Sequence, residues 1–140
     1  MASVLRCVFG DLVDALKTVV PENKIFLGDR PSISEGIEPL GTFAVIELPV
    51  SIEDLAIGNK KFVLQTMGVI YLFNKCKKDR TVRINDLSDS VDSVVGLFPI
   101  SGSYCVAADP SVLLRGSDGT GYHVTTITFN IHTRAGVFNS

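Results

Sequence analysis

The segment at residues 62–73, FVLQTMGVIYLF, is the longest strand candidate in the chain, and it constrains the fold more than any other feature. Successive side chains point to opposite faces of a strand, so a strand with one wet face alternates apolar and polar residues. This segment is apolar on both faces, which carry Phe62, Leu64, Ile70 and Leu72 on one side and Val63, Met67, Val69, Tyr71 and Phe73 on the other. Both faces of the strand are therefore expected to be buried against other parts of the protein or against another subunit.

The two faces of this strand need different cover. We expect the chain's own helices to cover one face, whereas the other needs a second sheet, a loop or another subunit. Left in water, Met67, Tyr71 and Phe73 would form a sizeable apolar patch, and such patches commonly mark interaction sites. These three residues are therefore predicted to lie in a subunit interface.

The composition favours one cytoplasmically folded domain spanning residues 1–140. The chain is 46% hydrophobic and only 20% charged, a lean charge content that fits surface hidden in an assembly. Its net charge of −2 provides no basic surface for nucleic acid. The 3 cysteines are odd in number and widely spaced, unlike a secreted disulfide scaffold. We find no signal peptide and no apolar run near the ~20 residues that cross a bilayer, so no membrane partner is expected.

Two amphipathic helices are predicted from apolar residues that recur at three- and four-residue spacing. The first runs from Ser3 to just before Pro21, and the second starts at Asn85 or Asp86 and ends before Pro99. Both apolar stripes need the same sheet face. The expected core residues are Leu12, Leu16, Ile70, Val94, Ile127 and Phe129.

Strands are predicted at residues 24–27, 42–48, 62–73, 103–107, 111–114 and 122–133. Gly68 suggests a bend or bulge in the long strand, and Asp109-Pro110 a turn between two short strands. Residues 51–61 are expected to form a polar connection with at most one helical turn. The predicted class is an α+β fold in which two helices pack on one face of a mostly antiparallel β-sheet.

Two segments are predicted to lie outside the regular elements. Residues 28–41 form a loop rich in Gly, Pro, Ser and charge, either an inconsequential surface excursion or an arm that reaches a neighbouring subunit. The second interpretation adds Ser32, Ile33 and Ile37 to the candidate interface. Residues 134–140 are expected to form a loose tail, and the basic run at 75–83 a solvated loop.

No motif identifies a catalytic, cofactor-binding or metal site, so we predict that the protein is not an enzyme and binds no cofactor. GSDGTG at residues 116–121 lacks the Gly-Lys-Ser/Thr ending of a phosphate-binding loop and precedes a strand, which indicates a hairpin loop. His123 and His132 fall on opposite faces of one strand. Zinc-binding spacings and a Gly-x-Ser-x-Gly motif are both missing. No spacing supports pairing Cys105 with a histidine as a nucleophile.

The order of elements resembles the tail-terminator and tail-completion proteins of long-tailed bacteriophages and related contractile systems. The similarity covers most of the chain. It rests on the helix SVLRCVFGDLVDALKTVV followed by VPENKIFLGDRP, on the strand TFAVIELP, and on the alternating end GSYCVAADPSVLLRGSDGTGYHVTTITFNIHTR.

This resemblance implies a structural virion protein of the tail and neck, assembled in the host cytoplasm. Such proteins form a homo-oligomeric ring, often a hexamer, that stops growth of the tail tube and joins it to the neck or head. The implied partners are further copies of the chain, the tail tube protein and the neck or connector proteins. DNA would pass through the ring without sequence-specific binding.

Two alternatives remain open. One is a head-side connector or stopper protein of the neck, which shares the ring and differs in its partner. The other, from a different class, is a small cytoplasmic ligand-binding or enzyme domain with a pocket near Cys105 and His123.

Overall fold

The computed structural model describes residues 4–27, 42–48, 55–58, 61–75, 84–117 and 122–134. Within these ranges the chain forms two α-helices, a short 3-10 helix and seven strands. In chain order they are α1 (Val4–Leu16), η1 (Glu22–Lys24), β1 (Ile25–Leu27), β2 (Thr42–Glu47), β3 (Leu55–Gly58), β4 (Lys61–Lys75), α2 (Ile84–Val95), β5 (Ile100–Ser101), β6 (Cys105–Ser117) and β7 (Tyr122–Thr133).

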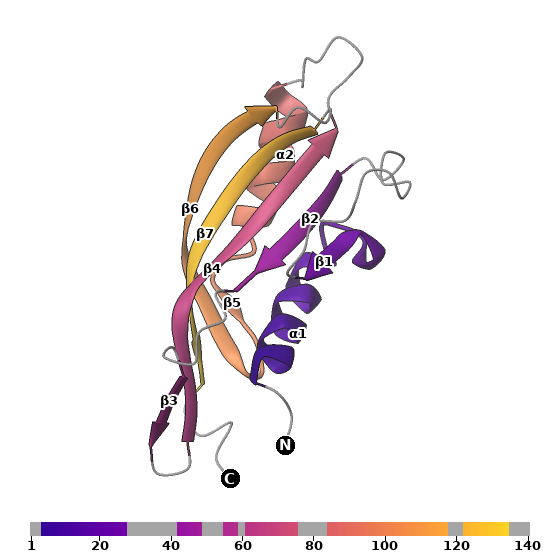
Figure 1. The fold of residues 1–140 in the computed structure, drawn as a ribbon. Helices are drawn as coiled ribbons and strands as arrows, with labels where there is room; N and C mark the ends of the chain where they lie inside the picture. The colour runs from indigo at the N-terminus through magenta and orange to yellow at the C-terminus, as the bar shows by residue number, and fades with distance from the viewer. Residues whose placement is uncertain are drawn as a thin grey trace.

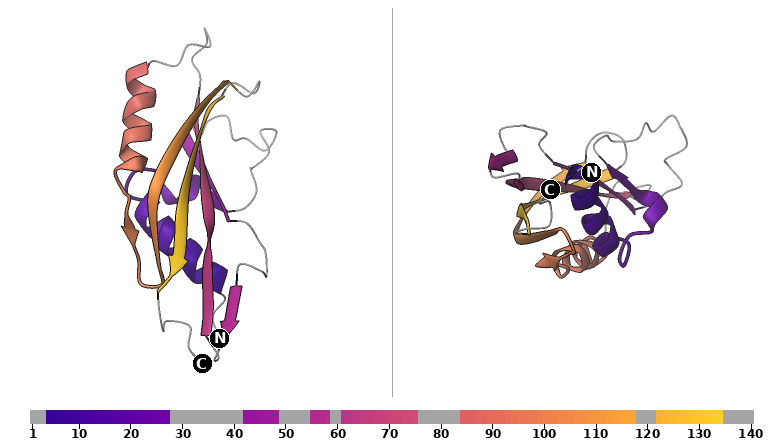
Figure 2. Two further views of the ribbon diagram at one scale, coloured as in Figure 1. Left: turned by 90° about the vertical axis from the view of Figure 1, so that its left-hand side faces the viewer. Right: turned by 90° about the horizontal axis from the view of Figure 1, so that it is seen from below.

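The strands form one curled sheet in the order β1-β2-β4-β7-β6-β5, and β3 pairs with the beginning of β4. Strands β4, β7 and β6 are long and curved, and the sheet bends around the side on which both helices lie (Figures 1 and 2). The sheet is mixed, because β1 runs parallel to β2 while the other neighbouring strands are antiparallel.

The predicted α+β class was wrong, because the described chain is mostly β and its sheet is mixed. Two misinterpreted segments account for much of the difference. Leu55–Gly58 is a strand paired with β4, where a polar connection with a helical turn was expected. Asp109-Pro110 is not a turn: β6 continues through it from Cys105 to Ser117, with a register shift between Ala108 and Ser111.

The main core lies between the sheet and both helices. All six residues expected there from the sequence are buried, which confirms that part of the prediction. The stripe of α1 contributes Val8, Leu12 and Leu16, and α2 contributes Val91 and Val94. The sheet contributes these residues to the same cluster: Ala44, Ile46, Ile70, Leu72, Ala107, Ile127, Phe129 and Ile131.

Gly68 is needed for close packing and does not mark a bulge. The register between β4 and β7 advances one residue for one residue, with Gly68 directly opposite Phe129. A Cβ atom at Gly68 would overlap the ring of Phe129 and crowd Leu48. The missing side chain therefore makes room for an aromatic ring of the core.

We expect Leu16→Ala to lower the free energy of unfolding by about 2–5 kcal/mol, because the fully buried side chain would leave a cavity under the sheet. Val19→Ala is the matched control, since Val19 is 39% exposed and should cost less than about 1 kcal/mol. Urea denaturation monitored by circular dichroism measures both. Equal midpoints for the two variants would show that α1 is not docked on the sheet.

Candidate functional site

The sheet face that points away from the helices carries a second apolar cluster. It contains Phe43, Val45, Phe73, Tyr122 and Val124. The rings of Phe43 and Phe73 stack with centroids 4.5 Å apart, and Tyr122 meets Phe43 edge-on at 5.1 Å. This cluster supplies the second dry environment that the doubly apolar strand requires.

The candidate interface residues on β4 differ sharply in exposure. Met67 is 53% exposed, Tyr71 is half-buried against the aromatic cluster, and Phe73 is only 4% exposed. Phe73 therefore belongs to the core of the subunit and offers little surface to a neighbour. The other three candidates, Ser32, Ile33 and Ile37, lie outside the described residues.

Three exposed apolar side chains follow one another at one edge of the sheet. Val112, Leu113 and Leu114 on β6 are 41%, 58% and 58% exposed. Strand β5 pairs only with Val106 and Ala107, so among the described residues β6 has no neighbour on its outer side from residue 111 onward. This stretch is a bare, apolar strand edge, and it was not among the interface residues predicted from the sequence.

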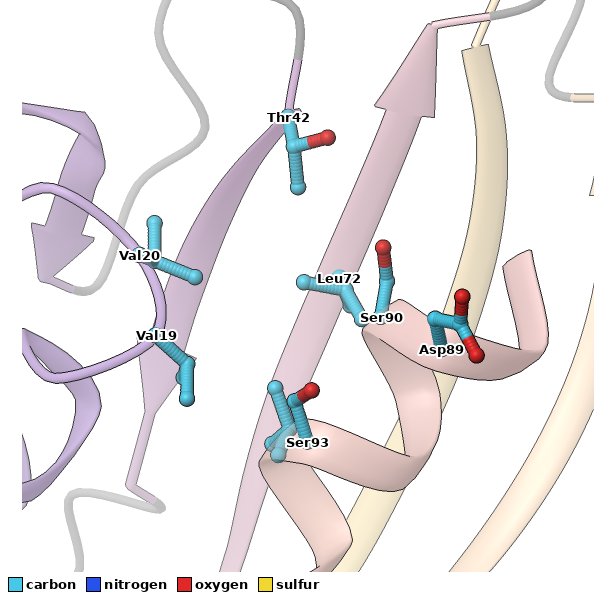
Figure 3. Close-up of a pocket in the computed structure, with 8 residues that line it drawn as sticks. Val19, Val20, Thr42, Leu72, Asp89, Ser90 and Ser93 are labelled. Carbon is cyan, nitrogen blue, oxygen red and sulfur yellow. The ribbon is translucent and has the colours of Figure 1, made fainter. Parts of the chain in front are cut away.

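A cavity of about 180 Å³ opens between the end of α1, the sheet and α2. Figure 3 shows Val19 and Val20 on one side, Asp89, Ser90 and Ser93 of α2 on the other, and Leu72 of β4 beside Ser90. Thr42 also lines it and donates a hydrogen bond from Oγ1 to Oδ1 of Asn74 at 3.1 Å.

Within the described part of the chain, several buried polar atoms on this sheet face lack hydrogen-bond partners. They include Asn74 Nδ2, Thr125 Oγ1 and His123 Nδ1. The register places Asn74 opposite His123 and Thr125 opposite Leu72, so these groups lie at the same end of the sheet as the cavity. Burying an unpaired polar group costs free energy. Sequence reasoning missed Asn74 and Thr125 because they carry no motif.

At the opposite end of the sheet, Asp11 fastens α1 to the start of β6. Its Oδ2 accepts hydrogen bonds from the backbone N–H groups of Tyr104 at 2.8 Å and Cys105 at 3.1 Å. The Cys105 thiol lies 3.5 Å from the same oxygen. Burial, and then the negative charge of Asp11, raise the pKa of Cys105 to about 12. The thiol is therefore protonated at neutral pH.

Arg134 closes the same corner and is not part of a loose tail. Its N–H donates to Tyr104 O at 2.8 Å and its Nε donates to Gly102 O at 2.6 Å. Its guanidinium also donates to Ser101 Oγ. The remainder of the expected tail, residues 135–140, lies outside the described part of the chain, as does most of the basic run at 75–83.

Cys105 and His123 cannot form a catalytic pair. Cys105 is opposite Thr133 at one end of β7, whereas His123 lies at the other end opposite Asn74. At the rise of a β-strand this separation is roughly 30 Å. Among the residues that the structure describes, no group of three or more His, Cys, Asp and Glu side chains could hold a metal ion.

Comparison with solved structures supports the fold. One solved structure has a TM-score of 0.57 to this chain, with 94% of each chain covered and 12% sequence identity. That protein carries no functional name, and at this identity the likeness concerns the fold alone. No family model matches the chain, and no curated protein matches it. Within the described ranges, neither helix is long and apolar enough to cross a membrane.

We expect Asp11→Ala to reduce the free energy of unfolding by about 1–3 kcal/mol, because two backbone N–H groups would lose a charged acceptor. Asp14→Ala on the same helix is the control. Asp14 forms a surface ion pair with Lys17, 3.2 Å long, which is worth about 0–1 kcal/mol. Thermal unfolding measures the stability of both variants. Equal destabilisation would show that Asp11 does not hold α1 against the start of β6.

We expect Cys105 to resist alkylation by iodoacetamide in the native protein at neutral pH and to react fully once urea unfolds the chain. The reason is its buried, protonated thiol, since the thiolate is the nucleophile. Because the pKa rises from 9.0 to about 12 on folding, this residue's contribution to stability should decline as pH rises through that interval. Peptide mapping by mass spectrometry measures the labelling, and rapid native modification would contradict the assignment.

Proposed function

We propose that this chain is a tail-terminator or tail-completion protein of a long-tailed bacteriophage, which forms a homo-oligomeric ring, most simply a hexamer. The ring would end the tail tube and join it to the neck. The whole-chain resemblance in the order of elements motivates the proposal. The observation that supports it is the exposure of large apolar side chains, Met67 on the outer sheet face and Leu113 and Leu114 on the β6 edge.

These exposed residues fit a protein that works in an assembly. Met67 lies on the face opposite the helices, level with Asn130 of β7, while the aromatic cluster occupies the other end of the same face. The subunit thus buries one part of this face by itself and leaves another part open. A patch of this kind commonly binds another protein. A head-side connector would use the same surface and differ only in the partner it contacts.

A second candidate, from a different class, is a small ligand-binding domain. The cavity beside Thr42 favours it, because the unpaired Asn74 Nδ2 and Thr125 Oγ1 lie nearby. At about 180 Å³, the cavity is below the usual size of pockets for drug-sized ligands. We therefore rank this function second.

The proposal is tested in a phage whose gene for this protein has been deleted. The Met67→Lys variant is supplied in its place. A lysine would place an unpaired charge in the proposed contact, so we expect tails of uncontrolled length or tails without heads. Electron microscopy of lysates reads this out.

The matched control is Ser88→Lys, which adds the same charge at an exposed position on α2. Both purified variants should melt like the wild type, which separates loss of assembly from loss of folding. Normal, joined tails with Met67→Lys would count against Met67 as a contact. Normal tails in the complete absence of the protein would refute the function.

A further inference from the structure

We propose that the outer edge of β6 in one copy pairs with the outer edge of β1 in the next copy, so that the sheet continues from subunit to subunit. This inference rests on the proposed ring and names the junction that would close it. It differs from the Met67 surface, which lies on a face of the sheet and not at its edge.

The pairing stretch on β6 is short and sharply bounded. Register shifts lie between Ala108 and Ser111 and between Leu114 and Gly116. Asp109 and Gly116 have positive φ angles of 58° and 86°. Bulges disrupt regular pairing, and Pro110 has no backbone N–H to donate. Only residues 111–114 therefore present a regular open edge.

The side chains of this stretch require an apolar partner on both sides. Val112 and Leu114 are opposite Ile127 and Thr125, on the helix side of the sheet, whereas Leu113 is opposite Thr126 and faces the other way. The sequence of the stretch, SVLL, contains no charge. Charged side chains are one common protection of natural edge strands, and this stretch lacks them. An added strand would satisfy the open backbone groups and cover the leucines.

Strand β1 meets these requirements at the opposite edge of the same sheet. It has 3 residues, IFL, and among the described residues it is paired only with β2. Leu27 is 50% exposed and is opposite Ile46, on the helix side that also carries Leu114. A second copy therefore provides a short, wholly apolar strand of 3 residues, which fits within the β6 stretch at residues 111–114.

The strand directions also fit this junction. Following the pairings across the sheet, β6 runs parallel to β4, whereas β1 runs antiparallel to β4. Rotation about an axis along the strands preserves these directions, so β6 of one copy meets β1 of the next in antiparallel orientation. The contact uses two different edges and is heterologous, which is the type of contact that closes into rings.

The test introduces opposite charges at the two edges. Leu114→Lys impairs the β6 edge and Leu27→Glu impairs the β1 edge, and each should shift the protein to monomer in sedimentation velocity across its soluble concentration range. An equimolar mixture of the two variants should recover association, because the intact β6 edge of one meets the intact β1 edge of the other. Gly10→Lys, on an exposed part of α1 where nothing lies within 4 Å, is the control and should associate like the wild type.

Three results would overturn the junction. Association lost in Leu114→Lys but unchanged in Leu27→Glu would indicate a symmetrical β6–β6 dimer. Rings that persist in both single variants would leave the proposed ring standing and exclude these edges. A wild-type protein that stays monomeric at every concentration would overturn the self-pairing. Whether the proposed function itself fails is decided separately by the tails that form in the complete absence of the protein.

Discussion

The pairing of β4 with β7 determines how the rest of the molecule is built. It runs without a shift from Gln65 opposite His132 to Lys75 opposite Tyr122. Alternate residues of the pair supply the two apolar clusters: Ile70 belongs to the cluster under the helices, and Phe73 to the aromatic cluster on the other face. A slip of one residue would exchange every side chain between these faces. The docking of both helices and the aromatic stack therefore depend on this one register.

The elements found correctly from the sequence are those with a long, regular period. The α1 stripe and the alternation of β7 each extend over enough residues to place Leu16 and Ile127 in the core. Short or interrupted strands were missed. Leu55–Gly58 is too short to show a period. The dipeptide Asp109-Pro110 carries a turn signal in the sequence, whereas in the structure it forms a bulge within β6, where Asp109 has a left-handed φ.

The candidate site was only partly predictable, because exposure depends on neighbours that are distant in sequence. Strand alternation correctly places Met67 and Phe73 on one face, yet Phe43 and Tyr122 bury Phe73 while Met67 stays open. The unpaired Nδ2 of Asn74 also has no local signature, since Asn74 lies between two strands that are distant in the sequence, opposite Thr42 of β2 and His123 of β7. Conversely, the β6 edge becomes visible only when the strand order shows that β5 covers just Val106 and Ala107.

The bulges of β6 have a consequence for assembly. They confine regular pairing to residues 111–114, so any single edge contact is short and correspondingly weak. A short apolar edge is less prone to uncontrolled aggregation than a long apolar edge. In a closed ring, however, each subunit uses both of its edges, and contacts made within one assembly benefit from high effective concentration. In the proposed ring, short edges therefore favour closure over sheets that grow freely in solution.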